Sequence, residues 1–430
     1  MATTREECFV FLQLPHSTET VTCGRFELVQ PDGSAPVGRF VYGRRYRARP
    51  DAVALDPFLL PLTASVKETA DERGLFGALR DAGPDAWGRM TIDRALGRSE
   101  LSEIEYLLHA PQDGAGALTF GRAAEPPPPL RPFNQVMQLE ALYEIARAIE
   151  DDRGGREMPA PAGIPPQVVQ LIEPSTAMGG ARPKNVVEDT DGLWLAKFPA
   201  RDDPWNNAAV EGGLLALAKR CGIRVPVTRR VRLGAQDVLL VQRFDRAPTG
   251  NPQVRYFRHR MVSALTVLRA SESPVERRNW SYLLLADELG RWSARPRRDR
   301  QELFRRMVFN CLVSNTDDHP RNHALIAAQE SWELAPAYDL TPTRLIGQTE
   351  RTLAMEIGTR GRQATRENVC SLAPRFDLTM AEADAIVSEI GAVVAAEWEG
   401  CLRFSGATTQ DVEAVRPAIL NVGFEYRASE

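Results

Sequence analysis

A short polar segment late in the chain, SNTDDHPRN at residues 314–322, carries residue types that could transfer a phosphoryl group. Protein kinases use an aspartate to accept the proton of the hydroxyl that is phosphorylated, and an asparagine five positions later to hold magnesium. Asp317 and Asn322 have this spacing. A second metal-binding aspartate is expected after one further hairpin, and the sequence WELAPAYD ends in Asp339. The spacing therefore predicts a phosphoryl-transfer loop that uses Mg²⁺.

The same segment allows two other interpretations. Aspartate and asparagine favour solvated turns, so the segment could be a turn without chemistry. Asp317, Asp318 and His319 could instead belong to the metal site of a hydrolase, which would need further histidine or carboxylate ligands. The remaining histidines are His16, His109, His259 and His323, of which the last is close in sequence but is expected on a strand.

A glycine-containing turn upstream could hold the phosphates of a nucleotide. It lies between two expected strands and consists of Gly179, Gly180, Ala181, Arg182, Pro183 and Lys184. Two glycines without side-chain bulk let backbone amides approach phosphates closely. The turn does not match the GxxxxGK[ST] pattern, so it is not a P-loop. A plain hairpin is the alternative interpretation.

Lys197 and Glu211 could form the ion pair that positions the phosphates of ATP in kinases. Lys197 is near the end of the apolar strand LWLAKFP, and Glu211 is in the helix that follows it. Glu211 stands within an apolar helical pattern, where an unpaired acid is costly. In the alternative interpretation, Lys197 is an edge-strand lysine that points to water.

The apolar strand at residues 238–244 passes abruptly into polar residues, as a hinge that offers backbone groups to adenine would. Taken alone it is an ordinary strand end. Its place in the chain matters more, because six signals follow one another in the order found in kinases. They are the glycine turn, the strand lysine, the helix glutamate, the hinge, the Asp-x4-Asn loop and the final aspartate. The six signals together predict a kinase.

The elements that would position these residues form a β-rich region followed by a helical one. Strands are expected at 168–172, 184–188, 193–198, 225–233 and 238–244, with a helix at 207–221 and mostly helices after residue 261. This succession predicts an α+β fold with a β-rich lobe and a helical lobe.

The chain of 430 residues is long enough for two or more folding units. Residues 1–122 are expected to form a first domain, with strands near 8–14, 24–30 and 38–42 followed by helices. Residues 123–166 contain two proline-rich stretches around an amphipathic bracing helix that begins near Asn134. Residues 167–430 are expected to be the main domain, with a β-rich lobe that ends near residue 246.

The composition is that of a globular protein, with 43% hydrophobic and 26% charged residues and a net charge of −4. An acidic balance disfavours direct nucleic-acid binding, and the seven arginines between residues 291 and 306 are interpreted as a solvated helix face. Six widely spaced cysteines fit a reducing compartment. No signal peptide or membrane span is visible, so we expect a cytoplasmic protein.

Several segments resemble the HipA family of bacterial toxin kinases. They are GGARPK, WLAKFP, VQRFDR, NTDDHPRNHAL and PAYDLTPT, and upstream PLTASV, GLFGALRDAGPDAWGR and DGAGALTFG. The likeness spans almost the whole chain, and NTDDHxxN followed by YDL is its most specific part. It implies a two-lobed, protein-kinase-like core preceded by a small α/β N-terminal subdomain.

The resemblance also implies roles for individual residues. Asp317 would be the catalytic base, Asn322 and Asp339 would hold Mg²⁺, and Lys197 with residues 179–184 would bind the phosphates of ATP. Residues expected to border adenine or line the same site are Gln242, Arg243, Phe244, His319 and Tyr338.

Members of this family phosphorylate serine or threonine of a protein, such as an aminoacyl-tRNA synthetase, and so arrest translation. The resemblance implies a HipB-like antitoxin as partner, and contact with DNA only through that antitoxin. The family's loop often carries a self-phosphorylated serine where this chain has Ala177. Either Ser175 or Thr176 takes its place, which is the favoured expectation, or only the partner holds the kinase in check. Two alternatives remain, a catalytically silent binding protein with a kinase fold and a kinase of a small molecule or lipid.

Overall fold

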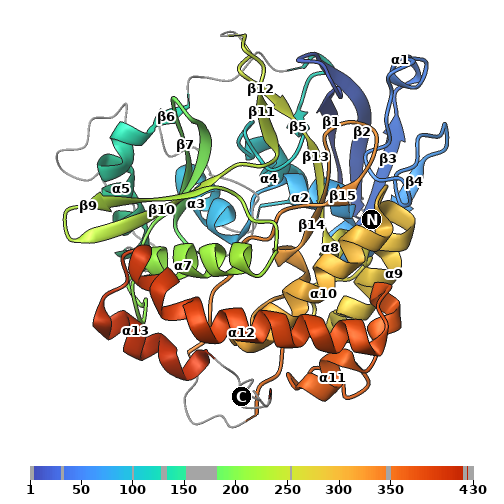
Figure 1. Ribbon diagram of the computed structural model, residues 1–430. Coiled ribbons are helices and arrows are strands. Elements are labelled where there is room, and N and C mark those ends of the chain that lie inside the picture. The colour runs from blue at the N-terminus through green and yellow to red at the C-terminus, as the bar shows by residue number, and fades with distance from the viewer. Residues whose placement is uncertain are drawn as a thin grey trace. The chain divides into compact units, whose positions relative to one another are not determined.

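The computed structural model describes residues 4–30, 33–98, 101–126, 133–151, 182–251, 254–344 and 350–419, together with Phe424. The chain forms two compact units, which are described separately (Figure 1). Unit 1 contains Met1–Phe198, Arg243–Val262 and Ile326–Glu330, and unit 2 contains Pro199–Gln242, Ser263–Leu325 and Ser331–Glu430. The domain boundaries expected from the sequence remain a prediction.

Unit 1 begins with an antiparallel sheet in the order β4-β3-β2-β1-β5. Its strands are β1 (Thr4–Gln13), β2 (Thr20–Gln30), β3 (Val37–Tyr42), β4 (Lys67–Thr69) and β5 (Leu118–Gly121). The first three are close to the strands that alternation in the sequence predicts. Side chains of β1 and β2 such as Val10 and Phe26 are fully buried, so one face of this sheet is part of a core.

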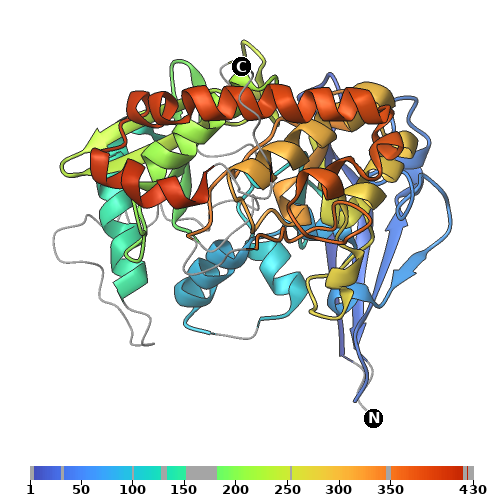
Figure 2. The same ribbon diagram turned by 60° about the horizontal axis from the view of Figure 1, so that its bottom comes forward.

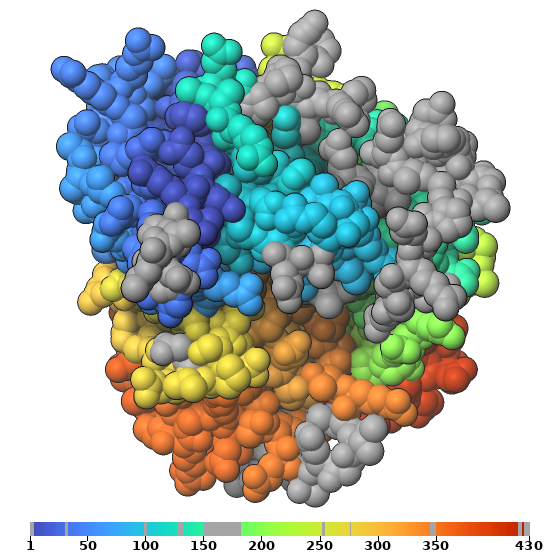
Figure 3. All heavy atoms as spheres, turned by 180° about the vertical axis from the view of Figure 1, so that it is seen from behind, coloured from blue at the N-terminus to red at the C-terminus, as the bar shows by residue number. Residues whose placement is uncertain are grey.

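Short helices follow this sheet: α1 (Arg44–Arg47), α2 (Gly77–Ala82), α3 (Ala86–Leu96) and α4 (Glu103–His109). Helix α3 begins at Asp85, whose side chain accepts a hydrogen bond from the amide of Gly88. Helix α4 begins with a capping box between Ser102 and Glu105. On the face shown in Figure 3, the blue to cyan residues of this N-terminal part lie next to one another.

The expected amphipathic helix is α5 (Leu139–Asp151), which starts five residues later than predicted and buries Leu139, Leu142 and Ile145. The other strands of unit 1 are β6 (Asn134–Gln135), β7 (Lys184–Asp189), β8 (Gly192–Lys197), β11 (Arg246–Pro248) and β12 (Tyr256–Arg258). Strands β7 and β8 pair antiparallel, as do β11 and β12. The chain passes between the units at β13 (Arg260–Ser263) and β14 (Ala324–Ala327).

Unit 2 is mainly helical. Its elements are α7 (Asn207–Arg220), β9 (Thr228–Leu233), β10 (Gln236–Gln242), α8 (Ala264–Val267), α9 (Tyr282–Trp292), α10 (Pro296–Leu312), β15 (Glu333–Leu334), α11 (Arg366–Cys370), α12 (Met380–Phe404) and α13 (Thr409–Val415). The long helix α12, drawn in red in Figure 2, packs against α7 and α10. A side chain at Gly213 of α7 would place its Cβ 2.8 Å from the Cα of Leu402, so this close helix contact requires glycine.

Most of the arginines between residues 291 and 306 form ion pairs. Arg291, Arg298, Arg300 and Arg305 pair with Glu288, Glu333, Asp377 and Glu389, and the buried Arg306 pairs with Glu302. These acids neutralise the local positive charge, but Arg306 is fully buried, so the interpretation as a solvated helix face does not hold for that residue. Within the described ranges, no helix combines the length and the apolar character needed to cross a bilayer.

Candidate active site

The loop that carries Asp317 joins α10 to β14 within unit 2. Helix α10 anchors it, because the face of the helix that includes Leu303, Met307 and Leu312 is fully buried. The chain turns out of the helix at Ser314, whose φ of 52° lies in the left-handed region. The amide of Asn315 then donates to the carbonyl of Asn310 at 3.0 Å. The loop therefore begins from a rigid position.

Asp318 fastens the middle of this loop to the interior of unit 2. Its carboxylate is buried and accepts from the Tyr282 hydroxyl, from Nδ2 of Asn310 at 2.8 Å and from Nε2 of His323 at 2.8 Å. Burial by itself would raise the pKa of this carboxyl, but His323 and the hydrogen bonds from His323 and Tyr282 hold the pKa below its ordinary value. Asp318 is therefore an ionised anchor.

This arrangement predicts how the stability of the protein depends on pH. Because the pKa of Asp318 is lower in the folded state, its charge stabilises the fold above the unfolded-state pKa of about 3.9, and this stabilisation is lost as pH falls through the folded pKa. Asp318→Asn should reduce the free energy of unfolding by about 2 kcal/mol at pH 7. The difference from wild type should shrink below about pH 4, as measured by urea unfolding at several pH values. Equal stability of the two proteins at pH 7 would show that Asp318 is not an anchor.

Asp317 has the opposite environment. Its side chain is exposed, and its carboxylate makes no hydrogen bond or ion pair with any residue that the structure describes. Its backbone carbonyl accepts from the amide of His319 at 2.8 Å and from Nδ2 of Asn322 at 3.4 Å. The backbone is thus held while the carboxylate remains available to accept a proton.

Asn322 is buried, and within the described part of the chain its side-chain oxygen has no hydrogen-bond partner. A buried amide oxygen without a donor is unfavourable unless a cation or water completes it. Oxygen atoms from an amide and a carboxylate are ligands that Mg²⁺ prefers. Asn322, together with Asp339, therefore fits a magnesium site.

The structure brings the segments of Asn322 and Asp339 together within unit 2. The hydroxyl of Tyr338 donates to the carbonyl of Arg321 at 2.7 Å. The amide of Thr343 donates to the carbonyl of Ser314 at 2.9 Å, and the hydroxyls of Thr316 and Thr343 lie 2.7 Å apart. Asp339 itself is half-buried and has a φ of 59°. The loop of Asp317 and the turn of Asp339 therefore form one constellation.

The hydrolase interpretation lacks ligands. The described residues contain no group of three or more His, Cys, Asp or Glu side chains placed to hold a metal ion. Asp318 and His323 form a hydrogen bond with each other. The ring of His319 lies edge-to-face against that of Trp280, with 6.2 Å between the ring centroids.

Part of the glycine turn, Gly179, Gly180 and Ala181, lies outside the described residues, as do Ser175 and Thr176. Arg182 and Pro183 lead into β7, whose first residue is Lys184. The ammonium of Lys184 is buried and donates to Asp85 at 2.6 Å. A phosphate contact by Lys184 would have to compete with this ion pair.

Lys197 and Glu211 lie in different units. Lys197 is the last residue of β8, is half-buried and belongs to unit 1. Glu211 is in α7 of unit 2 and is buried, as its place in an apolar pattern predicts. The ion pair between them remains a prediction.

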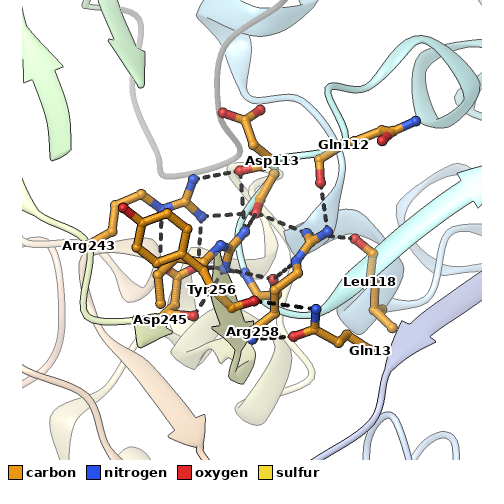
Figure 4. Close-up of polar contacts among 11 residues, drawn as sticks. Gln13, Gln112, Asp113, Leu118, Arg243, Asp245, Tyr256 and Arg258 are labelled. Atoms are coloured by element: carbon orange, nitrogen blue, oxygen red, sulfur yellow. Dashed lines mark hydrogen bonds and ion pairs between the residues drawn. The ribbon is translucent and has the colours of Figure 1, made fainter. Parts of the chain in front are cut away.

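The expected hinge follows β10, which ends at Gln242. In unit 1 the amide of Arg243 donates to the carbonyl of Leu193 in β8 at 2.9 Å, and the Arg243 side chain is fully buried. Its guanidinium contacts Asp245 and backbone carbonyls, as Figure 4 shows. The contact of Gln242 or Phe244 with adenine remains a prediction.

Sequence reasoning missed the residues that hold the loop in place, Tyr282 and Asn310, and it considered Asp318 only as a metal ligand. One signal was present, because Tyr282 and Asn310 are polar groups inside the apolar patterns of α9 and α10. Polar groups at such positions need hydrogen-bond partners. A nearby loop with two adjacent aspartates can supply such partners.

Comparison with known proteins agrees with this architecture. The HipA chain of the complex of HipA, HipB and operator DNA from Shewanella oneidensis MR-1 superimposes with a TM-score of 0.68 over 93% of each chain, at 20% identity. The fold is therefore α+β with a protein-kinase-like core, as expected from the sequence.

The chain belongs to the HipA-like C-terminal domain family, whose model matches residues 176–398, just over half of the chain. Two proteins of Sinorhizobium fredii that carry provisional kinase names are similar to it. Y4mE is 26% identical over 325 residues, which is 71% of this chain and 74% of the relative. Y4dM is 27% identical over 210 residues, 45% of this chain and 48% of the relative.

Proposed function

We propose that this chain is a serine/threonine protein kinase that transfers the γ-phosphoryl group of Mg-ATP. The observation that carries the proposal is the loop of unit 2, in which a buried Asp318 holds an exposed Asp317 beside Asn322, whose side-chain oxygen has no partner among the described residues. Membership of the HipA-like family and the names of the two Sinorhizobium relatives support kinase activity.

In the proposed reaction, the carboxylate of Asp317 accepts the proton of the acceptor hydroxyl as that oxygen attacks the γ-phosphorus. Asn322 and Asp339 would hold Mg²⁺, which neutralises charge on the phosphates when it is bound. Lys197, held by Glu211, and the turn at residues 179–184 would orient the phosphates. Residues 242–244, His319 and Tyr338 would complete the nucleotide site.

The biological role that we propose is that of a toxin controlled by an antitoxin. The similar HipA of Shewanella oneidensis was solved with HipB and operator DNA, which supports a HipB-like partner and only indirect contact with DNA. A translation component such as an aminoacyl-tRNA synthetase is the proposed substrate, in the cytoplasm. Ser175 or Thr176 is the proposed site of self-phosphorylation, since Ala177 cannot accept phosphate.

The experiment that tests this function uses the purified protein, γ-labelled ATP with Mg²⁺, and a bacterial lysate. We expect label on serine or threonine of one or a few lysate proteins, and label on the chain itself within residues 175–176. EDTA should abolish both signals. Label found only in lipids or small molecules would reject a protein acceptor, and the absence of any transfer would indicate a silent binding protein.

A further inference from the structure

Unit 1 contains a cluster of three arginines around one aspartate, hereafter the arginine cluster: the buried Arg243 and Arg246 and the half-buried Arg258, with Asp245 (Figure 4). Arg243, Asp245 and Arg246 directly follow Gln242, and Arg258 comes from the neighbouring strand β12, where it pairs with Arg246. The cluster therefore surrounds the start of the segment that we propose to border adenine.

Asp245 is the centre of the cluster. It has no exposed surface and accepts from Nε and Nη2 of Arg243 at 3.0 and 2.7 Å, and from Nη1 of Arg246 at 2.6 Å. A fourth donor is the amide of Gly116 at 2.9 Å. Asp245 thus joins the end of the expected hinge directly to the N-terminal part of the chain.

Asp245 is the one carboxylate that hydrogen-bonds within the cluster, although the charge of Asp113 also acts on all three guanidinium groups. Further acceptors are backbone carbonyls of one segment, residues 112–118, which leads into β5. Arg243 and Arg246 donate to Gly114 at 3.0 and 2.6 Å. Arg258 donates to Gln112 at 2.7 Å and to Leu118 at 3.2 Å. Buried cations without such acceptors are strongly unfavourable, so the expected hinge depends on this segment for its position.

The environment shifts the pKa values of these arginines in different directions, and that of Arg243 is raised by Asp245 although burial opposes it. Burial and the neighbouring Arg243 lower the pKa of Arg258 to about 10, and the same two causes lower that of Arg246. The segment also fits closely at Gly116, which has a φ of 76° and whose Cβ would lie 3.3 Å from the amide nitrogen of Met261. A residue with a side chain there would be strained.

Arg243 is consequently held both by its main chain and by its side chain. Its amide donates to Leu193 of β8 at 2.9 Å, and its side chain donates to Asp113, Gly114 and Asp245. A shift of residues 112–118 would have to move the backbone of Arg243 and Phe244, or break several charge-assisted hydrogen bonds.

We propose that residues 112–118 and Arg258 position the backbone at Arg243 and Phe244, so that the affinity of the site for ATP depends on the N-terminal part of the chain. Arg258 is a positioning residue in this scheme, because its guanidinium donates to residues 112–118 and acts through them on the backbone at Arg243. The expected effect on ATP affinity rests on the proposed function. The positioning of the backbone at Arg243 and Phe244 rests only on contacts within unit 1.

Arg258→Met in the full chain is the sharpest test. It removes the hydrogen bonds that Arg258 donates to residues 112–118, leaves those of Arg243 and Arg246 and the pairs of Asp245 intact, and removes one half-buried cation, so we expect a folded protein. The KM for ATP should rise about tenfold, while kcat and the KM for the acceptor change much less. The KM for ATP of Arg258→Lys should lie between those of wild type and Arg258→Met. Arg39→Met is the matched control, because Arg39 forms an exposed ion pair with Glu68 on the sheet of the same unit, and it should leave all constants unchanged.

Amide hydrogen exchange without nucleotide separates this inference from the proposed function. Faster exchange at residues 243–246 in Arg258→Met than in Arg39→Met supports the positioning role even if the wild type transfers no phosphate. Exchange equal to wild type, or a KM for ATP within twofold of it, overturns the inference. If Arg258→Met does not fold, the same two measurements on Arg258→Lys decide.

Discussion

Asp317→Asn should lower the rate of phosphoryl transfer by about 10²–10⁴-fold, the usual contribution of a general base. Asparagine keeps the size of the side chain but cannot accept the proton. Because Asp317 is exposed and its carboxylate contacts no described residue, the unfolding free energy should change by less than about 0.5 kcal/mol. The measurement is transfer from labelled ATP under single-turnover conditions, with urea unfolding beside it.

The neighbouring Asp318 supplies the matched control. Asp318→Asn should show a clear loss of stability, and transfer by the fraction that remains folded should fall less than in Asp317→Asn, because the carboxylate of Asp317 is still present. Toxicity on expression should disappear in Asp317→Asn if the toxin role holds. Undiminished transfer by Asp317→Asn would remove this residue from the mechanism.

Lys197→Met should lower kcat/KM for ATP by about 10²–10³-fold, since a positioned charge on the transferring phosphates has an effect of that size. Glu211→Ala should act in the same direction, because a lysine without its partner would leave the phosphates. The measurement is steady-state transfer at varied ATP concentration.

Lys219→Met is a suitable control for the loss of a lysine, because Lys219 is an exposed residue near the end of α7. It should leave kcat/KM unchanged. A structure of the ATP complex in which the charged atoms of Lys197 and Glu211 are more than about 4 Å apart would contradict the pairing.

Much of the fold could be predicted from local patterns. Alternating apolar residues predicted strands near those observed as β1, β2 and β3, and apolar helical patterns predicted α5 and α7. The order and spacing of the motifs were enough to indicate the family. These features are local, because periodicity and motif spacing depend only on neighbours along the chain.

The roles of two adjacent aspartates could not be separated in this way. In the sequence Asp317 and Asp318 are equivalent acids, and only the kinase spacing favoured the first. The structure buries Asp318 among Tyr282, Asn310 and His323, and leaves Asp317 exposed. Which side chain turns inward depends on α9 and α10 packing beside the loop.

The sequence by itself therefore determined the fold class, the family and the candidate loop of Asp317 and Asn322. Tertiary structure alone decided where the buried charges find their partners: Lys184 meets Asp85, which is 99 residues away, and Arg258 meets the carbonyl of Gln112, 146 residues away. The physical reason is that a charge can leave water only where distant segments supply acceptors for it, and no pattern along the chain encodes which segments those are.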